Sequence, residues 1–405
     1  MLNAKICETR TITYEIMVQH DGRWLIDCLL EQKLEAVARA RALLARGAAE
    51  AVKVVKRRSR ADGQSVTTEV LHETLADPKG PRFALSGTPE NLPVCKTLSD
   101  LESAAGRRTI GRLLRDYLQH CQITPTELMF CWPHARRLRD DCSLLQAAIH
   151  HVASRQADKA GQSAGARVKA LDALVDQAIK RAHSLDSERR KWPRLEAGTL
   201  RDLEETVRLG VPGEAKRPLF LALLSDRLLL LAGLEHKLEF LLRLLDGAAG
   251  PAGEGGIESV IADCLAFPDV LQAVAGAPGT RFARLCLLAD VLAGRLSPAR
   301  RQELPALAAL TALIKDGRGE ACRRTLEERL AADLAGKAPL DASGAQPEKR
   351  LIELLGRRLR QSDGSWIGGE ATRRALEARG RRLREQSLRD LGLQSTADSL
   401  ASGDC

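Results

Sequence analysis

The chain has 405 residues, of which 44% are hydrophobic and only 3% aromatic, and its formal net charge is +9. This length predicts two or three domains, with cores built mainly from Leu, Ala and Val. The modest positive charge permits contact with nucleic acid, anionic lipid or an acidic protein but requires none of them, and the scattered cysteines argue against a disulfide scaffold.

The ten cysteines contain no CxxC pair, which indicates free thiols in a reducing compartment. The first ten residues carry charges and no apolar signal segment, so we expect a cytoplasmic protein. Arg, Ala and Leu abound, whereas Asn3 and Asn91 are the only asparagines. This bias indicates a GC-rich coding sequence and hence a bacterial origin.

Residues 1–76 predict a small ββαββ module. Two alternating segments flank Asp21-Gly22, which is a strong hairpin signal, and a helix over 31–46 precedes two further strands. The side chains that we expect to face the core of the first hairpin are those of Ile12, Tyr14, Ile16, Val18, Trp24, Ile26 and Cys28. One helix would then cover one face of an antiparallel sheet.

The third strand and the turn after it form a basic cluster. Its candidate contacts for nucleic acid or an acidic partner are Lys53, Lys56, Arg57 and Arg58. A sheet that stacks RNA bases needs exposed aromatic residues on neighbouring strands. Because Tyr14 and Trp24 are expected to face the core, we favour a solvated charged hairpin over an RNA-binding face.

Breaks rich in Pro and Gly divide the remaining chain, which we expect to be predominantly α-helical. The overall class is therefore α+β. The expected parts are the module (1–76), a Pro-rich linker (77–97), a helical bundle (98–246), a flexible linker (247–256), helical hairpins (257–336), a linker (337–347), a basic helical hairpin (348–391) and a disordered tail (392–405). Capping boxes are expected at Ser99–Glu102 and Thr124–Glu127, the second with Pro125 at the first helical position.

The densest group of potential metal ligands lies between His120 and His151. Its candidates are His120, Cys121, Cys131, His134 and Cys142. A structural zinc site usually draws two ligands from one short knuckle or one helical turn, and these cysteines are about ten residues apart. We therefore expect no metal here, although a helical enzyme or metalloprotein using this region is one alternative.

The stretch from Pro218 to Gly247 is the most apolar part of the chain. We expect it to form one central helix of the bundle, with a stripe formed by Leu221, Leu224, Leu228, Leu231, Leu238, Leu242 and Leu245. Charges such as Asp226, Arg227 and Lys237 interrupt it too often for a membrane span. Glu235 is the acid on the stripe, and if it is buried it requires an Arg or His partner.

The last predicted helix, Glu370–Leu391, is rich in arginine. Residues 349–390 hold twelve Lys or Arg against six Asp or Glu. Its candidate contacts for nucleic acid or an acidic partner are Arg373, Arg374, Arg381, Arg382 and Arg384. We favour a solvated face of a packed helix; the alternatives are binding to nucleic-acid phosphates, to an anionic membrane surface or to an acidic partner.

The sequence lacks the local signatures of the commonest enzyme classes: no P-loop, GxGxxG after a strand, GxSxG, HExxH or kinase motif occurs. We therefore expect no cofactor and no catalytic site. The leading hypothesis is a non-enzymatic interaction or regulatory protein, an adaptor or scaffold, with a protein partner. Nucleic-acid binding by the Arg-rich helix is the alternative, and the oligomeric state stays open.

Overall fold

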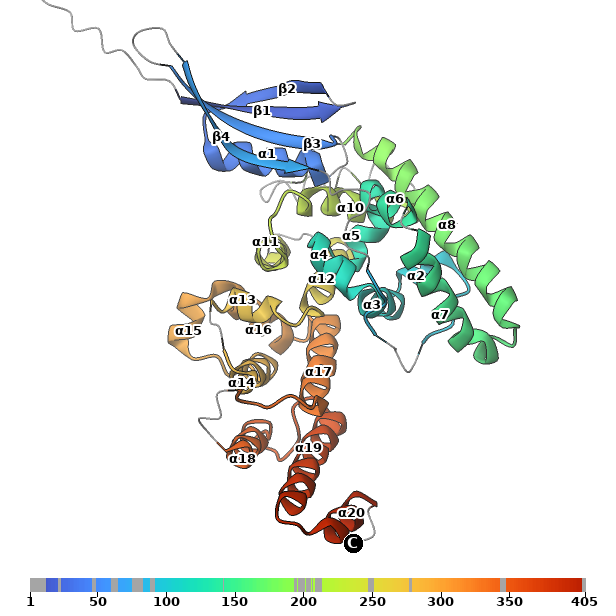
Figure 1. Cartoon of the computed structure of the whole chain (residues 1–405), viewed down its shortest axis with the longest axis vertical. Coiled ribbons are helices and arrows are strands. Elements are labelled where there is room, and N and C mark those ends of the chain that lie inside the picture. Colours follow the sequence, from blue (N-terminus) through green and yellow to red (C-terminus); the bar gives the residue numbers. More distant parts are fainter. Residues whose placement is uncertain are drawn as a thin grey trace, which may run out of the picture. The chain divides into compact units, whose positions relative to one another are not determined.

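The computed structural model describes most of the chain, which folds as two compact units, Met1–Gly233 and Leu234–Cys405 (Figure 1). The residues that it does not describe are 1–11, 21–22, 46–48, 60–64, 75–82, 88–91, 141, 193–194, 196–200, 202–204, 206, 208–212, 247–250, 277–278, 343–346 and 403–405. The hairpin signal at Asp21-Gly22 therefore falls outside the described residues.

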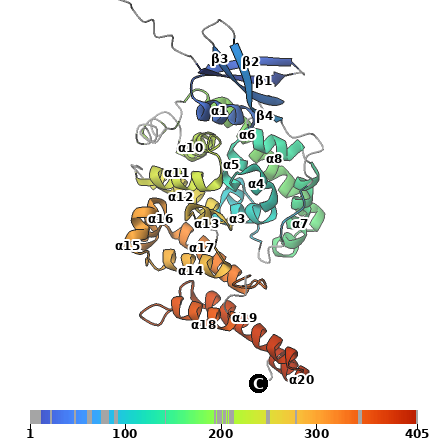
Figure 2. The ribbon, with the colours of Figure 1, turned by 60° about the vertical axis from the view of Figure 1, so that its left-hand side comes forward.

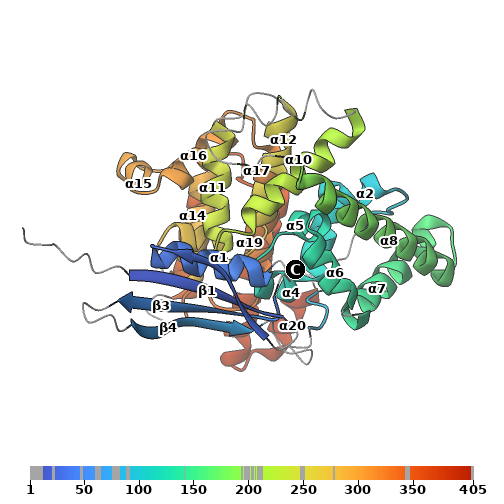
Figure 3. The ribbon, with the colours of Figure 1, turned by 90° about the horizontal axis from the view of Figure 1, so that it is seen from above.

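The N-terminal ββαββ module and the α+β class are confirmed. The strands are β1 (Ile12–His20), β2 (Arg23–Leu30), β3 (Ala51–Ser59) and β4 (Ser65–Thr74), with helix α1 (Lys33–Ala45) between β2 and β3. They form one antiparallel sheet in the order β2-β1-β3-β4. Figures 1 and 3 show α1 running along one face of this sheet. Among the described residues of the module, no helix or strand covers the other face, which we call the open face.

The core of the module lies between α1 and the sheet. Because side chains alternate along a strand, every second residue of β1 and β3 reaches this layer. The buried members of the core are Tyr14, Ile16, Val18, Ala36, Ala40, Ala49, Val52 and Val54. Four of the seven side chains predicted for the first hairpin core, including half-buried Cys28, take part in this layer.

A β-bulge at Asp27 explains where the prediction for β2 was wrong. Ile16 pairs with Cys28, but the next residue, Met17, pairs with Ile26, so Asp27 is an extra residue in β2. The bulge keeps Cys28 on the α1 side and turns Ile26 to the open face. By the same alternation, Trp24 lies on the open face and not in the core. Ile12 is also exposed, at 38%.

The first unit continues with short and long helices. They are α2 (Leu98–Glu102), α3 (Ala104–Leu113), α4 (Arg115–Cys121), α5 (Pro125–Phe130), α6 (Trp132–Asp140), α7 (Cys142–Ala160), α8 (Ala164–Arg189) and α10 (Gly213–Leu228). The capping box of α5 is confirmed, since Thr124 and Glu127 exchange bonds with each other's backbone N–H and Pro125 is the first helical residue. The box of α2 begins two residues earlier than predicted, at Thr97, and uses Asp100.

The apolar stretch from 218 to 247 forms two helices, so the prediction of one helix was wrong. Helix α10 ends at Leu228, and α11 (Leu234–Asp246) begins after Gly233, whose φ of 91° is in the left-handed region. The boundary between the two units falls at this break, inside the range expected for a single bundle. Six of the seven predicted leucines are buried, and Leu231, which lies in the break, is half-buried.

The regular elements described in the second unit are all helices. Its helices after α11 are α12 (Pro251–Leu265), α13 (Val270–Val274), α14 (Arg281–Leu292), α15 (Pro298–Glu303), α16 (Pro305–Lys315), α17 (Glu320–Ala335), α18 (Glu348–Arg358), α19 (Gly369–Asp390) and α20 (Gln394–Ser402). Helix α17 contacts α12 and α14 as well as α19, so it joins the two ends of this unit (Figure 2).

Two segments expected to lack structure are helical. Residues 251–256 of the predicted flexible linker form the start of α12, where Pro251 suits the first helical position. Residues 394–402 of the predicted disordered tail form α20, which packs against α19. Gly392, with a φ of 78°, lets the amide of Leu393 reach the carbonyl of Leu388, and this left-handed turn reverses the chain after α19.

Within the described residues, no helix combines the length and the apolar content that crossing a bilayer requires.

Candidate functional site

The edge strand β2 carries an unusual concentration of exposed apolar side chains. Leu25 is 55% exposed, and Ile26 and Leu29 are each 58% exposed. Leu34, at the start of α1, is 83% exposed. We call Leu25, Ile26 and Leu29 the β2 edge surface. These three residues together with Leu34, which lies on α1 and not on the strand, make up half of the large hydrophobic side chains found exposed among the described residues.

The two edges of the sheet differ in chemistry. The outer strand β4 presents polar exposed side chains, including Thr67, Thr68 and Glu69. Strand β2 presents leucine and isoleucine on both of its faces: Leu25 lies on the α1 side, and the bulge at Asp27 places Ile26 and Leu29 together on the open face. An edge strand has unpaired backbone N–H and C=O groups, and charged or bulged edges usually prevent pairing with other chains. Among the described residues of β2, the charged ones are Arg23 and Asp27.

The open face of the sheet carries charges that are already paired. Glu15 is 6% exposed and its Oε1 lies 3.0 Å from Nη1 of Arg57. Nζ of Lys53 lies 3.7 Å from Oε2 of Glu69 and 5.3 Å from the ring centre of Trp24. The basic cluster predicted on β3 is therefore divided between two faces and is partly neutralised on the open one.

The helices of the first unit surround an apolar cavity of about 130 Å³, which is partly open to the surface. It lies between α3, α5, α6, α7 and α8 and is closed by the segment that contains Pro93 and Cys95. The lining includes Ile110, Leu113, Leu138, Ile149, Leu171 and Ile179.

Arg167 and Gln156 form a buried hydrogen-bonded pair beside this cavity, which we call the clamp. Nε and Nη2 of Arg167 donate to Oε1 of Gln156 at 2.9 and 2.8 Å, and Nη2 also donates to the carbonyl of Cys95. Nε2 of Gln156 donates to the carbonyl of Pro93. The clamp ties the segment 92–95 to α7 and α8, and it occupies the polar atoms of Gln156, which also lines the cavity.

The predicted metal ligands do not converge. His120 is exposed on α4, with its ring centre 5.2 Å from that of Phe83, whereas His134 is buried on α6. Cys121 ends α4, Cys131 follows α5, and the side chain of Cys142 lies outside the description. Across the described part of the chain, no three His, Cys, Asp or Glu side chains are grouped so that they could hold a metal ion.

Cys131, which is buried, is not an activated nucleophile. Burial raises the pKa of the Cys131 thiol to about 12, and the opposing effects of the hydrogen bond from the backbone of His134 and of the Arg189 charge are smaller. Nucleophilic cysteines require a lowered pKa, because the thiolate is the reactive form. Cys131 therefore acts as a small apolar side chain in the core of the first unit.

Three of the five candidate arginines of α19 have polar contacts within the protein. Arg373 and Arg374 both contact Glu370 on the same helix, and Arg382 donates to the carbonyl of Ala335 at the end of α17. Arg381 and Arg384 are exposed. The candidate nucleic-acid surface of five arginines is thereby reduced to two exposed side chains that no described ion pair engages.

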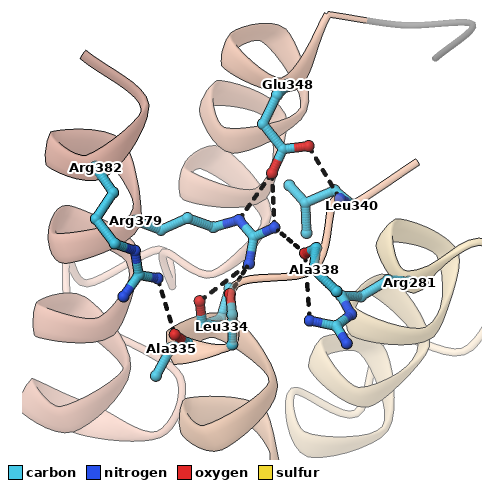
Figure 4. A network of polar contacts seen from close by, with 9 residues as sticks. Arg281, Leu334, Ala335, Ala338, Leu340, Glu348, Arg379 and Arg382 are labelled. Carbon is cyan, nitrogen blue, oxygen red and sulfur yellow. Dashed lines mark hydrogen bonds and ion pairs between the residues drawn. The ribbon is translucent and has the colours of Figure 1, made fainter. Parts of the chain in front are cut away.

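The most heavily bonded arginine of α19 was not among the predicted site residues. Arg379 is 4% exposed and donates to the carbonyls of Leu334, Gly336 and Ala338, which lie at and beyond the end of α17 (Figure 4). These bonds satisfy carbonyl groups that the helix itself leaves without partners. The basic pattern of α19 thus reflects, at this position, the capping of a neighbouring helix.

Glu235 is not the buried charge of α11. Its side chain is 34% exposed in the first turn, and Oε1 lies 3.3 Å from Nδ1 of His236. Lys237 is instead 1% exposed. The sequence could not distinguish the two, because both positions lie among leucines.

Sequence reasoning missed both candidate sites, although signals were present. The segment Trp24–Leu30 is apolar on both faces, a pattern that an edge strand cannot bury. The cavity is lined by small residues as well as leucines, among them Ala135, Ala148 and Ala178. Nothing in the sequence alone shows that these alanines face one space.

A scan against protein-family models found no match, and searches of curated proteins and of solved structures returned no similar protein.

Proposed function

We propose that the protein is a non-enzymatic interaction protein that binds an extended segment of a different protein along strand β2. The observation that carries this proposal is the β2 edge surface, in which Leu25, Ile26 and Leu29 are each more than half exposed. Such binding adds a strand to an existing sheet, a recurrent way of recognising peptides.

The backbone of β2 supplies the affinity in this proposal. Strand β2 is the outer strand beside β1, and no described strand pairs with its other side, where an edge strand offers N–H and C=O groups to an incoming chain. An incoming strand would pair with these groups as β1 does on the opposite side. Main-chain bonds of this kind are largely independent of the partner's sequence, and the side chains on either side then provide selectivity.

The exposed side chains define the chemistry of the partner. Ile26 and Leu29 lie on the open face, and Leu25 lies toward the α1 side. A partner strand that alternates apolar residues on its two faces would cover both sets and remove them from water. Arg39 of α1 already pairs with Asp27, with 3.0 Å between Nε and Oδ2, so the bulge adds no free acid to this surface.

The test is the capture of partners by the full chain and by two matched variants. Ile26→Lys places a charge on the β2 edge surface, and Thr68→Lys places the same charge on the opposite edge of the sheet. Both side chains are exposed, so folding should be unaffected, as circular dichroism would verify. Photo-crosslinking from an aromatic ketone at position 29 would show whether the captured protein lies on β2.

The proposal expects one or more proteins retained by the unaltered chain and by Thr68→Lys, crosslinked at position 29, and lost from Ile26→Lys. Equal recovery by all three chains would place binding elsewhere and overturn it. A doubled mass in solution that Ile26→Lys abolishes would assign the surface to a second copy of this chain. That result also contradicts binding of a different protein.

Nucleic-acid binding by α19 has weaker support, because Arg373, Arg374 and Arg382 have contacts within the protein. It predicts a mobility shift that falls steeply as salt rises. Arg381→Glu together with Arg384→Glu would remove such a shift and leave partner capture through β2 unchanged.

A further inference from the structure

We propose that the cavity in the first unit is a binding site for a small uncharged apolar molecule, of the size of a single aromatic ring or a short hydrocarbon chain. This site is separate in its residues from the β2 edge surface. The cavity lies within the helices α3, α5, α6, α7 and α8, and its volume is about 130 Å³. An engineered apolar cavity of about 150 Å³ stays dry and binds benzene.

The lining determines the class of ligand. Its side chains are almost all aliphatic, and no charged residue is among them. The hydroxyl of Thr109 donates to the carbonyl of Ala105 at 3.0 Å, and the Gln156 amide is held by Arg167 and the carbonyl of Pro93. A polar ligand would lose its hydration without finding a free donor or acceptor in return. An apolar ligand has no hydrogen bonds to water to lose when it enters the cavity.

The packing around the cavity indicates a maintained space. Ala135, Ala148 and Ala178 line it from three different helices, at positions where a larger apolar residue would fill the volume. Each of these alanines is buried, so its small size is not explained by a position on the surface. Ile110, Leu145 and Val152 line the same space and are only half-buried, because the cavity opens to the surface on their side.

The clamp of Arg167 and Gln156 fixes one wall. It holds the segment 92–95 against α7 and α8, so that Pro93 and Cys95 close the cavity. The cavity is therefore bounded by polar bonds that a ligand need not break. A preformed site of this kind binds with little reorganisation of the protein.

The experiment uses the full chain and fluorobenzene, with binding followed by the ¹⁹F resonance of the probe and by the melting temperature. Ala148→Leu fills the cavity, and Ala178→Leu fills it from another helix if the first variant folds poorly. Ala147→Leu is the matched control, because it adds the same volume to the exposed face of α7. The charged analogue 4-fluorobenzoate tests the class of ligand.

The unaltered chain and Ala147→Leu should bind fluorobenzene saturably and melt at a higher temperature in its presence. Each filled variant should weaken binding at least tenfold, and 4-fluorobenzoate should not bind. No saturable binding to the unaltered chain would show that the space is a packing defect and overturn the proposal. Equal binding by the control and both filled variants would also overturn it, because the probe would then occupy another place.

Discussion

Arg379 of α19 and Glu348 of α18 form an ion pair with two hydrogen bonds. Nε and Nη2 of Arg379 lie 2.9 and 2.7 Å from Oε1 of Glu348, and the arginine side chain is only 5% exposed. Glu348 uses its second oxygen to accept from the amide of Leu340 at 2.9 Å. The pair thereby connects α18, α19 and the segment that follows α17.

Replacing Arg379 by Met should destabilise the second unit by about 3–5 kcal/mol, because removal of one partner leaves a partly buried charge and several carbonyls without bonds. Chemical denaturation of the two proteins measures the difference. Arg381→Met, on an exposed position two residues away, is the control and should change stability by no more than about 0.5 kcal/mol. Equal effects of the two substitutions would contradict the structural role of Arg379.

Gly106→Ala should destabilise the first unit by about 1–3 kcal/mol. A methyl group there would collide with the backbone carbonyl oxygens of Leu101 and Asp100, which cannot move as a flexible side chain does. Gly380→Ala supplies the contrast, since a methyl group in that part of α19 meets nothing within 4 Å. It should stabilise the protein by about 0.5–1 kcal/mol through helix propensity alone. Thermal unfolding of both variants checks the opposite signs.

Acidification should loosen the first turn of α19. Hydrogen bonds from Arg373 and Arg374 lower the pKa of Glu370 from 4.5 to about 2. A carboxyl group whose pKa is lowered by folding stabilises the folded state above its unfolded pKa, and this contribution is lost as the pH falls from 4.5 toward 2. A ¹³C NMR titration of the Glu370 carboxyl checks the value. Since the group is exposed, high salt should move the pKa back toward 4.5.

Thiol labelling of the folded protein at pH 7.5 should spare Cys131. Its pKa of about 12 leaves almost no thiolate, and burial denies access to the reagent. Cys121 is half-buried and should react faster. Mass spectrometry of peptides after a timed maleimide reaction measures both. Comparable labelling of the two thiols before unfolding would show that the core around Cys131 opens readily.

The sequence predicted local structure well where the signal was local. The capping box at Thr124 and Glu127 needs only three residues to be recognised, and the alternation of Tyr14, Ile16 and Val18 needs only one strand. The bulge at Asp27 lies beyond such a pattern. An extra residue in one strand is defined by its pairing with another, so the period of β2 alone indicated the wrong face for Trp24.

The remaining errors have a common physical cause. The leucine spacing continues on both sides of Gly233, so the pattern could not show that the helix ends there. Arg379 and Arg381 look alike in the sequence, and only the packing of α17 against α19 buries one of them. The cavity and the β2 edge surface depend likewise on which described elements pack beside them.

The bulge in β2 also sets how this strand tolerates changes in length. Loss of Asp27 would leave Cys28 and Ile26 opposite Ile16 and Met17 as they are now, at the expense of one exposed ion pair with Arg39. Loss of Leu25 would instead turn Trp24 and Arg23 over to the opposite faces of the sheet. We therefore expect the strand to accept a deletion of Asp27 but not a deletion of Leu25.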